Sequence, residues 1–310
     1  AMELKPGMEV IVPSLTYVAT GNAVVYCGAR PVFADSDPTT WNVTAESIKA
    51  AWTPKTVGVI VVHLYGLPAP VEEIVELCRE RGAWLIEDCA ESLGATRWER
   101  PTGTFGDAAI WSFYGNKTIS TGEGGMIALR DPGRLGLARM LRGQGMDPKR
   151  RYWHPIMGYN YRMTNVAAAI GVGQLQMIEH HVGERRRVAA AYRRGLAHLA
   201  GSGALVFPGE PDGSVSSHWL FSAVMATGGA TRRANVQEIL QRDYGVETRP
   251  FFVPMHRFPM YEGTACEGSM RHAEFLGDHG MNFPSYTGLT DADIGQICEA
   301  IADAMRRTAN

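Results

Sequence analysis

The 310-residue sequence has little net charge, few cysteines and no long apolar run. Its formal net charge is −2, so no global field draws the chain to nucleic acid or to an anionic membrane, and an anionic ligand must be held locally. The five cysteines form no C-x-x-C pair and no cluster with histidines at metal-ligand spacing. This pattern predicts buried thiols in a reducing compartment and no metal site.

No apolar run approaches the ~20 residues that span a bilayer, and no apolar core follows a basic flank at the N-terminus. These absences predict a soluble, cytoplasmic protein without a membrane partner. The basic stretch 184–194 sets its arginines among alanines on a predicted helix, without the aromatic platform that binds single strands. We therefore expect no nucleic-acid partner. His180 and His181 are adjacent on that helix and point in different directions, which disfavours a metal pair.

Short apolar runs do occur, and they alternate with amphipathic segments. Six of them predict buried strands, at 9–13, 31–35, 57–63, 83–88, 108–113 and 124–130. Between them, 70–81 has the apolar spacing of a helix, with Gly82 suited to its C-terminal cap. Alternating strands and helices predict an α/β fold whose mainly parallel sheet has helices on both faces.

The pattern changes in the second half of the chain. A helical stretch runs from 164 to about 199, weakened only by glycines, and predicts a long helix that bridges two subdomains. Beyond a Gly-rich linker there are two predicted strands and a helix at 230–244. We expect a large domain over 1–199, which includes the bridging helix, and a smaller C-terminal α+β domain over 200–310.

Two polar residues follow predicted strands, where the ligands of open α/β sheets bind. Asp88 ends the strand 83–88, and Lys117 comes soon after the strand 108–113. Alone, Lys117 would be a solvated charge and Asp88 a turn or cap residue. However, three glycines after Lys117 let a flat ligand approach the backbone, and Ser112 offers a hydroxyl to an anion. A desolvated lysine forms Schiff bases, and a carboxylate pairs well with a protonated pyridine nitrogen.

With these residues in view, the chain resembles the DegT/StrS-type sugar-nucleotide aminotransferases, which are pyridoxal-phosphate (PLP) enzymes of fold type I. The resemblance covers nearly the whole chain through blocks that occur in the family order: GMEVIVPSLTYVAT, VHLYGLPA, IEDCAESLGA, GTFGDAAIWSF, NKTISTGEGGM, GYNYRMTN and TRPFFVPMH. The run RYWHPIMGYNYRMTN is most similar to the GDP-perosamine-synthase-like branch of the family.

The resemblance implies a role for each matching position. Lys117 would bond covalently to PLP and move the proton of the reaction, and Asp88 would pair with the pyridinium nitrogen. Tyr17 would stack on the pyridine ring, and Ser112 would bind the phosphate. Asn160 would reach the phosphate in the neighbouring subunit, which implies a homodimer with shared active sites.

Arg249 and His256 resemble positions near the nucleotide sugar in relatives. Glu91 departs from the family pattern, since most members have glutamine there, near the phenolic oxygen of the cofactor. A carboxylate at this place repels that oxygen unless it is protonated or turned away. The chain also begins after a segment in which relatives bind the PLP phosphate with the backbone of an S-G-T turn. We therefore expect the first sheet strand and a main phosphate anchor to be absent.

The function that the resemblance implies is amination of a nucleotide-linked keto sugar, with a 4-keto-6-deoxyhexose as first choice and an amino acid such as glutamate as donor. Two alternatives stay open: a cyclitol aminotransferase, and a catalytically silent relative of the fold. A dehydratase of the same fold has histidine in place of the lysine, so Lys117 disfavours it. The sequence leaves the nucleotide, the aminated carbon and the pathway open.

Overall fold

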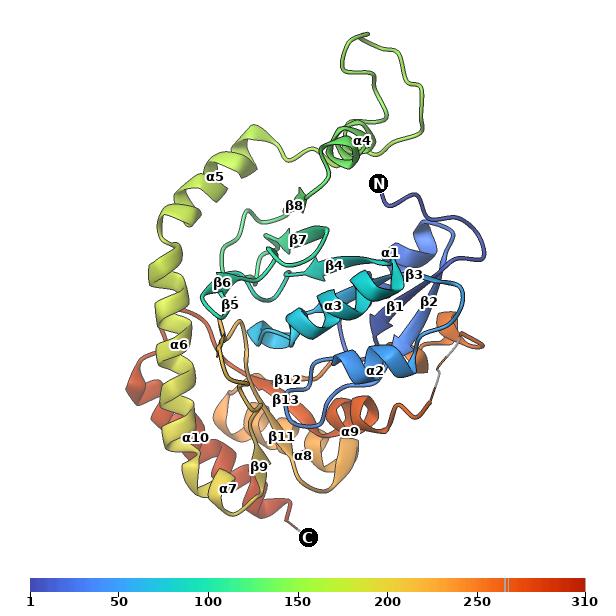
Figure 1. Ribbon diagram of the computed structural model, residues 1–310. Coiled ribbons are helices and arrows are strands. Elements are labelled where there is room, and N and C mark those ends of the chain that lie inside the picture. The colour runs from blue at the N-terminus through green and yellow to red at the C-terminus, as the bar shows by residue number, and fades with distance from the viewer. Residues whose placement is uncertain (265, 267, 310) are drawn as a thin grey trace.

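A six-stranded sheet lies at the centre of the first half of the chain in the computed structural model, which describes residues 1–264, 266 and 268–309 (Figure 1). Its strands stand in the order β2-β1-β3-β4-β7-β8. They are β1 (Glu9–Pro13), β2 (Arg30–Ala34), β3 (Thr56–Val62), β4 (Trp84–Asp88), β7 (Ala108–Ser112) and β8 (Gly125–Leu129). Every neighbouring pair is parallel except β7 with β8. The six predicted strands are confirmed, and so is the mainly parallel α/β sheet.

Helices cover both faces of this sheet because its strands are apolar on both sides. On one face, α2 (Ala45–Ala50) and α3 (Val71–Arg81) pack against a cluster that includes Val61. On the other face, α1 (Ala19–Tyr26) packs against a cluster that includes Ile60. Because neighbouring residues of a strand point to opposite faces, one apolar run supplies both cores. The helix α3 ends at Gly82, whose left-handed backbone confirms the predicted cap.

The predicted single helix over 164–199 is wrong, because the chain forms three helices there: α5 (Asn165–Gln176), α6 (Ile178–Gly195) and α7 (Ala197–Gly201). The first break is at Met177, whose N–H bonds to the carbonyl of Gln174, three residues back, so that the turn tightens. None of the helical glycines causes it. The break separates α5, which has no buried residue, from α6, whose side chains enter a second core.

That second core lies between α6 and a four-stranded antiparallel sheet in the order β12-β13-β11-β9. Its strands are β9 (Leu205–Val206), β11 (Phe221–Met225), β12 (Arg249–Pro250) and β13 (Gly280–Phe283), and its helices are α8 (Gly229–Tyr244), α9 (Arg271–His279) and α10 (Asp291–Arg307). Tyr192 of α6 stacks on Phe221 with 4.6 Å between ring centroids. The division into 1–199 and 200–310 stays a proposal, with α6 joining the two cores.

The remaining elements are short. A small sheet joins β5 (Thr96–Arg97), β6 (Arg100–Pro101) and β10 (Ser214–Val215), and η1 (Leu64–Gly66), η2 (Met255–Arg257) and η3 (Pro259–Tyr261) are single turns. The helix α4 (Pro132–Arg142) leads into the segment 143–164, which extends away from the sheet before α5 (Figure 1).

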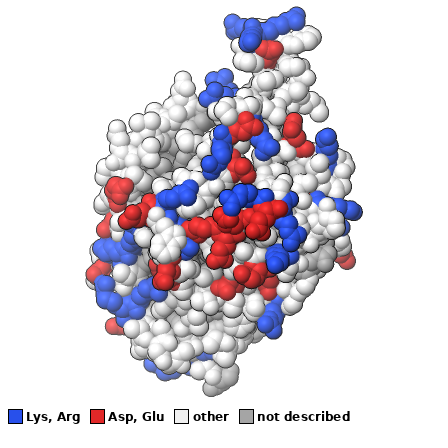
Figure 2. Space-filling view, viewed as in Figure 1, with Lys and Arg blue, Asp and Glu red and all other residues white. Residues whose placement is uncertain are grey.

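The surface differs in character from one element to the next. Figure 2 shows acidic side chains gathered over α3, in the middle of the view, and an uncharged surface over α5 at the upper left. The sequence of α5, NVAAAIGVGQLQ, contains no charged residue. Among the described residues, no helix has the length and apolar character needed to cross a bilayer.

The second core generates a stability prediction. Val236 of α8 is fully buried in it, whereas Val25 of α1 is 47% exposed. We expect Val236→Ala to lower the free energy of unfolding by roughly 2 kcal/mol, because it removes buried methyl groups and leaves a cavity. Val25→Ala, the matched control, should change it by less than about 0.5 kcal/mol. Urea titration followed by circular dichroism measures both, and equal shifts would contradict the packing described here.

Candidate active site

Lys117 lies in the loop that follows β7, where its backbone N–H closes a turn by donating to the carbonyl of Tyr114 at 3.0 Å. The side chain is half-buried, and its Nζ lies 3.8 Å from the centroid of the Trp219 ring. Burial lowers the pKa of Lys117, while the nearby Glu91 and Asp88 oppose that change. The free amine is therefore more available near neutral pH than that of an exposed lysine.

Asp88 is the last residue of β4, and two donors orient its carboxylate. The hydroxyl of Thr20, at the start of α1, donates to Oδ2 at 2.8 Å, and the backbone N–H of Ala90 donates to Oδ1 at 3.1 Å. Burial raises the pKa of Asp88, and these two donors and Lys117 act in the opposite direction. Both hydrogen bonds favour the ionised form, which is the form that pairs with a cation.

Glu91 is buried beside Lys117 and accepts a hydrogen bond at Oε2 from the backbone N–H of Tyr65, at 2.7 Å. Burial raises the pKa of Glu91 to about 7, with Lys117 and the Tyr65 N–H opposing the rise and Asp88 adding to it. Both protonation states are therefore populated near neutral pH. Glu91 can therefore be protonated, which is the state in which a carboxyl group is tolerated near the phenolic oxygen of the cofactor.

Tyr17 lies shortly after the end of β1, and Ser112 is the last residue of β7. Both are at the same edge of the sheet as Asp88. The ring of Tyr17 is 59% exposed, and its centroid lies 5.8 Å from that of Phe252. The hydroxyl of Ser112 accepts a hydrogen bond from the backbone N–H of Tyr114 at 3.3 Å, and it can still donate. The structure thus places Tyr17, Asp88, Ser112 and Lys117 at or just after the carboxyl ends of β1, β4 and β7 of one sheet, and the strand-end positions predicted for Asp88 and Lys117 are confirmed.

Among the described residues, no hydrogen bond or ion pair joins the other three candidates to this group. Asn160 is exposed in the segment 143–164, and among the described residues its side chain makes no hydrogen bond to another candidate. Arg249 is exposed on β12, with its guanidinium 3.8 Å from the carboxylate of Glu247. The sugar-nucleotide role of Arg249 and the cross-subunit role of Asn160 stay predictions.

His256 uses both of its ring nitrogens within the chain. Nδ1 lies 2.7 Å from the hydroxyl of Ser14, and Nε2 lies 3.1 Å from a carboxylate oxygen of Glu274. The neighbouring Met255 N–H also donates to the carbonyl of Ser14 at 2.7 Å. His256 thereby joins η2 and α9 to the end of β1, and its role in substrate binding stays a prediction.

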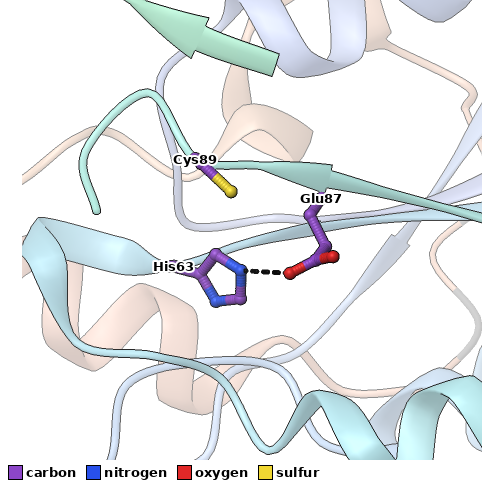
Figure 3. Close-up of side chains that lie close together, drawn as sticks. All are labelled: His63, Glu87 and Cys89. Carbon is purple, nitrogen blue, oxygen red and sulfur yellow. Dashed lines mark hydrogen bonds and ion pairs between the residues drawn. The ribbon is translucent and has the colours of Figure 1, made fainter. Parts of the chain in front are cut away.

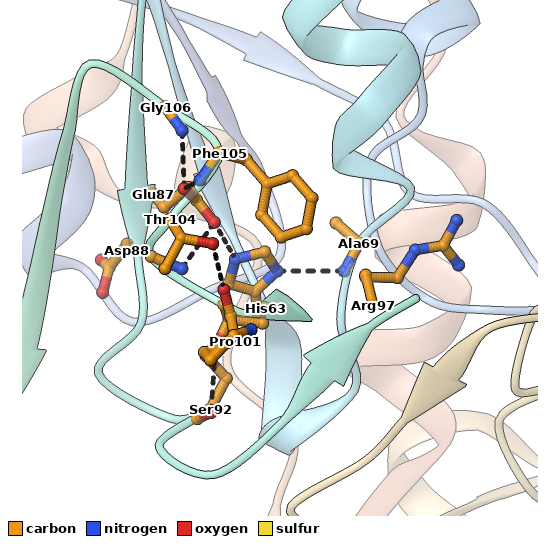
Figure 4. Close-up of polar contacts among 12 residues, drawn as sticks. His63, Ala69, Glu87, Asp88, Ser92, Arg97, Pro101, Thr104, Phe105 and Gly106 are labelled. Carbon is orange, nitrogen blue, oxygen red and sulfur yellow. Dashed lines mark hydrogen bonds and ion pairs between the residues drawn. The ribbon is translucent and has the colours of Figure 1, made fainter. Parts of the chain in front are cut away.

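Glu87 precedes Asp88 on β4 and points to the opposite face, where it accepts four hydrogen bonds (Figure 4). The backbone N–H groups of Gly103, Phe105 and Gly106 each lie 2.7 Å from its oxygens. Nε2 of His63 lies 3.2 Å from Oε2. Burial alone would raise the pKa of Glu87, but His63 and the backbone donors reverse this and lower it.

His63, Glu87 and Cys89 place possible metal ligands within 4.8 Å of one another (Figure 3). Nδ1 of His63 accepts from the Ala69 N–H at 3.0 Å, so Nε2 carries the proton and donates to Glu87. Burial raises the pKa of Cys89, which keeps its thiol protonated. These ring nitrogens and carboxylate oxygens are already in use, so the group serves as a hydrogen-bond network that fixes the strand ends.

Sequence reasoning missed three residues that contact the candidates: Thr20, Tyr65 and Trp219. Each comes from a different segment, and the bond between Trp219 and the lysine loop joins residues 103 positions apart. Thr20 does lie in the family block PSLTYVAT, three residues after Tyr17, which was a usable signal. For Trp219 the sequence offers only its place at the start of a predicted strand.

The side chains gathered at this edge of the sheet fit PLP. A lysine of lowered pKa can bond to its aldehyde, a carboxylate held by two donors can pair with its ring nitrogen, and an exposed aromatic ring lies on the same edge. Bound there, PLP supplies the electron-accepting ring that stabilises negative charge on a reacting carbon.

Comparison with known proteins agrees with this geometry. The model of the DegT/DnrJ/EryC1/StrS aminotransferase family matches residues 1–302. The chain belongs to that family, and it is a PLP-dependent sugar aminotransferase with the fold-type-I architecture expected above.

Individual relatives span nearly all of the chain. GDP-perosamine synthase from Caulobacter vibrioides is 44% identical over 97% of this chain and 80% of its own length. The enzyme of that name from Escherichia coli O157:H7 is 40% identical with the same coverage. The aminotransferase TlmJ from Streptoalloteichus hindustanus superposes with a TM-score of 0.91 at 34% identity, over 100% of this chain and 82% of its own.

The network around Glu87 generates a pH prediction. Because its folded pKa is lowered, Glu87 stabilises the fold fully above its unfolded pKa of about 4.3, and this contribution is lost as the pH falls through the folded pKa. We expect Glu87→Gln to cost on the order of 3 kcal/mol at pH 7, since an amide nitrogen would face backbone donors.

The difference between wild type and Glu87→Gln should narrow below about pH 4. Urea denaturation at a series of pH values measures it. Glu76→Gln, in an exposed pair with Arg79, is the matched control and should change stability little at any pH. A difference that stayed constant across the acid range would show that the charge of Glu87 is not what stabilises the fold.

Proposed function

We propose that this enzyme transfers an amino group from an amino acid such as glutamate to the keto carbon of a nucleotide-linked sugar, with a 4-keto-6-deoxyhexose as first choice. The observation that carries the proposal is the approach of Lys117, Asp88 and Glu91 within one site, where both carboxyl groups act on the pKa of Lys117 and Lys117 acts on the pKa of each of them. The names of the relatives support the substrate class. They include GDP-perosamine synthases and, at 33% identity, dTDP-4-dehydro-2,3,6-trideoxy-D-glucose 4-aminotransferase from Saccharopolyspora spinosa.

In this proposal the residues of the chain divide the work between them. With PLP bound, Lys117 would hold its aldehyde, and the Nζ of Lys117 would take up the proton of the reacting carbon and give it back later in the reaction. Asp88, oriented by Thr20 and Ala90, would pair as a carboxylate with the protonated ring nitrogen. Tyr17 would cover the ring, and Ser112 would bind the phosphate. Glu91 exchanges a proton near neutral pH because its pKa is about 7.

The sequence analysis left two alternative functions open. A cyclitol aminotransferase would use the same lysine and aspartate and differ only in the acceptor pocket. A silent relative would keep the fold without chemistry, and the lowered pKa of Lys117 argues against it. A cytoplasmic location is part of the proposal as well.

We further propose that the enzyme works as a homodimer with shared active sites. Apolar side chains are exposed along the segment 143–164 and α5, among them Met157, Tyr161, Val166 and Leu175. Since α5 has no charge and buries nothing within its own chain, a second copy is the occupant that fits this face. Asn160 is exposed in the same segment, and in this proposal it reaches the partner's cofactor.

The first functional prediction concerns Lys117. Wild-type protein with added PLP should show the visible absorption band of the lysine-bound cofactor, and Lys117→Ala should lack it. Turnover should fall by about 10²–10⁴-fold, the usual contribution of a positioned acid–base group. Lys55→Ala, an exposed lysine of the same chain, is the control and should behave as wild type. A full band or normal turnover in Lys117→Ala would refute the role of this residue.

The second functional prediction concerns the shared sites. Lys117→Ala and Asn160→Ala chains, each weak alone, are co-expressed so that mixed dimers form. Each mixed dimer then has one site with both defects and one with neither, so random pairing restores up to about one quarter of wild-type activity. If both residues serve the site of their own chain, mixing restores nothing. Native mass spectrometry confirms that mixed dimers are present.

A further inference from the structure

Trp219 is far from Lys117 in the sequence but contacts its amine in the folded chain. It is 4% exposed, and it lies just before β11, in the segment that enters the second core. Its ring centroid is 3.8 Å from Nζ of Lys117, and its indole N–H donates to the carbonyl of Asn116 at 2.8 Å. One side chain thus contacts both the amine of Lys117 and the loop that carries it.

Arg185 of α6 fixes the backbone of the same pair. Its Nη1 donates to the carbonyl of Trp219 at 2.5 Å and to that of Ser285 at 3.1 Å, and its Nη2 donates to the carbonyl of Lys117 at 3.4 Å. Arg185 is 8% exposed, and among the described residues no carboxylate forms a salt bridge with it. A buried cation is costly unless its donors are used, and Arg185 uses Nη1 and Nη2 on these carbonyls while its Nε has no partner among the described residues. The guanidinium thereby ties the backbone of Trp219 to that of Lys117.

We propose that the indole face of Trp219 holds the Lys117 amine whenever that amine is not bonded to PLP, which makes Trp219 a positioning residue for proton transfer. The proposal rests on the proposed function. In that reaction the C–H bond of the amino acid breaks, its proton passes to Nζ of Lys117, and the electron pair is left to the bound cofactor.

The physical basis is the attraction of N–H groups to the negative face of an aromatic ring. The attraction is weak while the amine is neutral and able to accept the proton, and it becomes stronger once proton uptake makes the group an ammonium, most of all over tryptophan. A lysine side chain has four rotatable bonds, so a released amine would otherwise spread over many positions. Holding it against one surface keeps the proton acceptor near the reacting carbon. The ring also favours the charged form of the amine and shields one side of it from reagents.

The first test uses cofactor-free protein. Limited acetylation with acetic anhydride at fixed pH, followed by peptide mass spectrometry, gives the rate at Lys117 relative to the exposed Lys49 and Lys55. Trp219→Leu should raise the relative rate about fivefold, because the amine is uncovered and less often charged. Trp219→Phe, which keeps a ring face without the N–H, should stay near wild type.

Two results would overturn the proposal: an unchanged rate in Trp219→Leu, or an equal rise in the Leu and Phe variants, which would assign the effect to the indole N–H. Trp219→Met provides a second ring-free variant if Trp219→Leu does not fold, as judged by circular dichroism. The measurement needs no cofactor, so it is independent of the proposed function, which the spectrum of the wild type with PLP decides.

The second test follows proton transfer in a single half-reaction with glutamate deuterated at Cα. Trp219→Leu should slow the step about tenfold and raise its isotope effect, with the KM for glutamate nearly unchanged, whereas Trp219→Phe keeps both values close to wild type. A loss that appears in KM alone, with an unchanged isotope effect, would contradict the proposal, because a general loosening of the site changes binding and not the proton step.

Discussion

A buried carboxylate such as Glu87 needs hydrogen-bond donors around it. Meeting this need fixes the positions of several chain segments near the carboxyl end of β4. Three backbone N–H groups from the loop before β7 and one histidine nitrogen from the end of β3 meet it. The ends of β3 and β4 and the loop that leads into β7 are thereby tied to one group. Because neighbouring residues of a strand face opposite ways, fixing Glu87 on one face also fixes Asp88 on the other, at the candidate active site.

The active site depends on the joint between the two cores in the same way. Trp219 comes from the segment that enters the antiparallel sheet, and Arg185 comes from α6, yet both contact the lysine loop of the large sheet. His256 makes a similar connection from η2 and α9 to the end of β1. The parts of the chain beyond the large sheet thus act on the site through contacts with its loops, in addition to any contact with substrate.

Much of this architecture could be predicted from the sequence, since apolar runs of five to seven residues are a strong local signal for strands of a parallel sheet. The positions of Asp88 and Lys117 followed from the ends of those strands, and their roles came from the family resemblance. Local signals could not place Thr20 on Asp88 or Trp219 on Lys117, because those contacts depend on how distant segments pack. The break at Met177 was missed for a similar reason: no glycine or proline marks it, and it separates a helix without buried residues from one that packs in a core.

The uncharged helix α5 has a consequence for how the protein behaves in the cell. If a second copy covers this face, as proposed, part of the free energy of folding comes from association, and the stability of each chain then depends on its own concentration. At low concentration, newly made chains would expose this apolar surface until they associate with a second copy. During that time they would bind chaperones and be open to proteolysis. The level of expression would then set the fraction of chains that survive as well as the amount of enzyme.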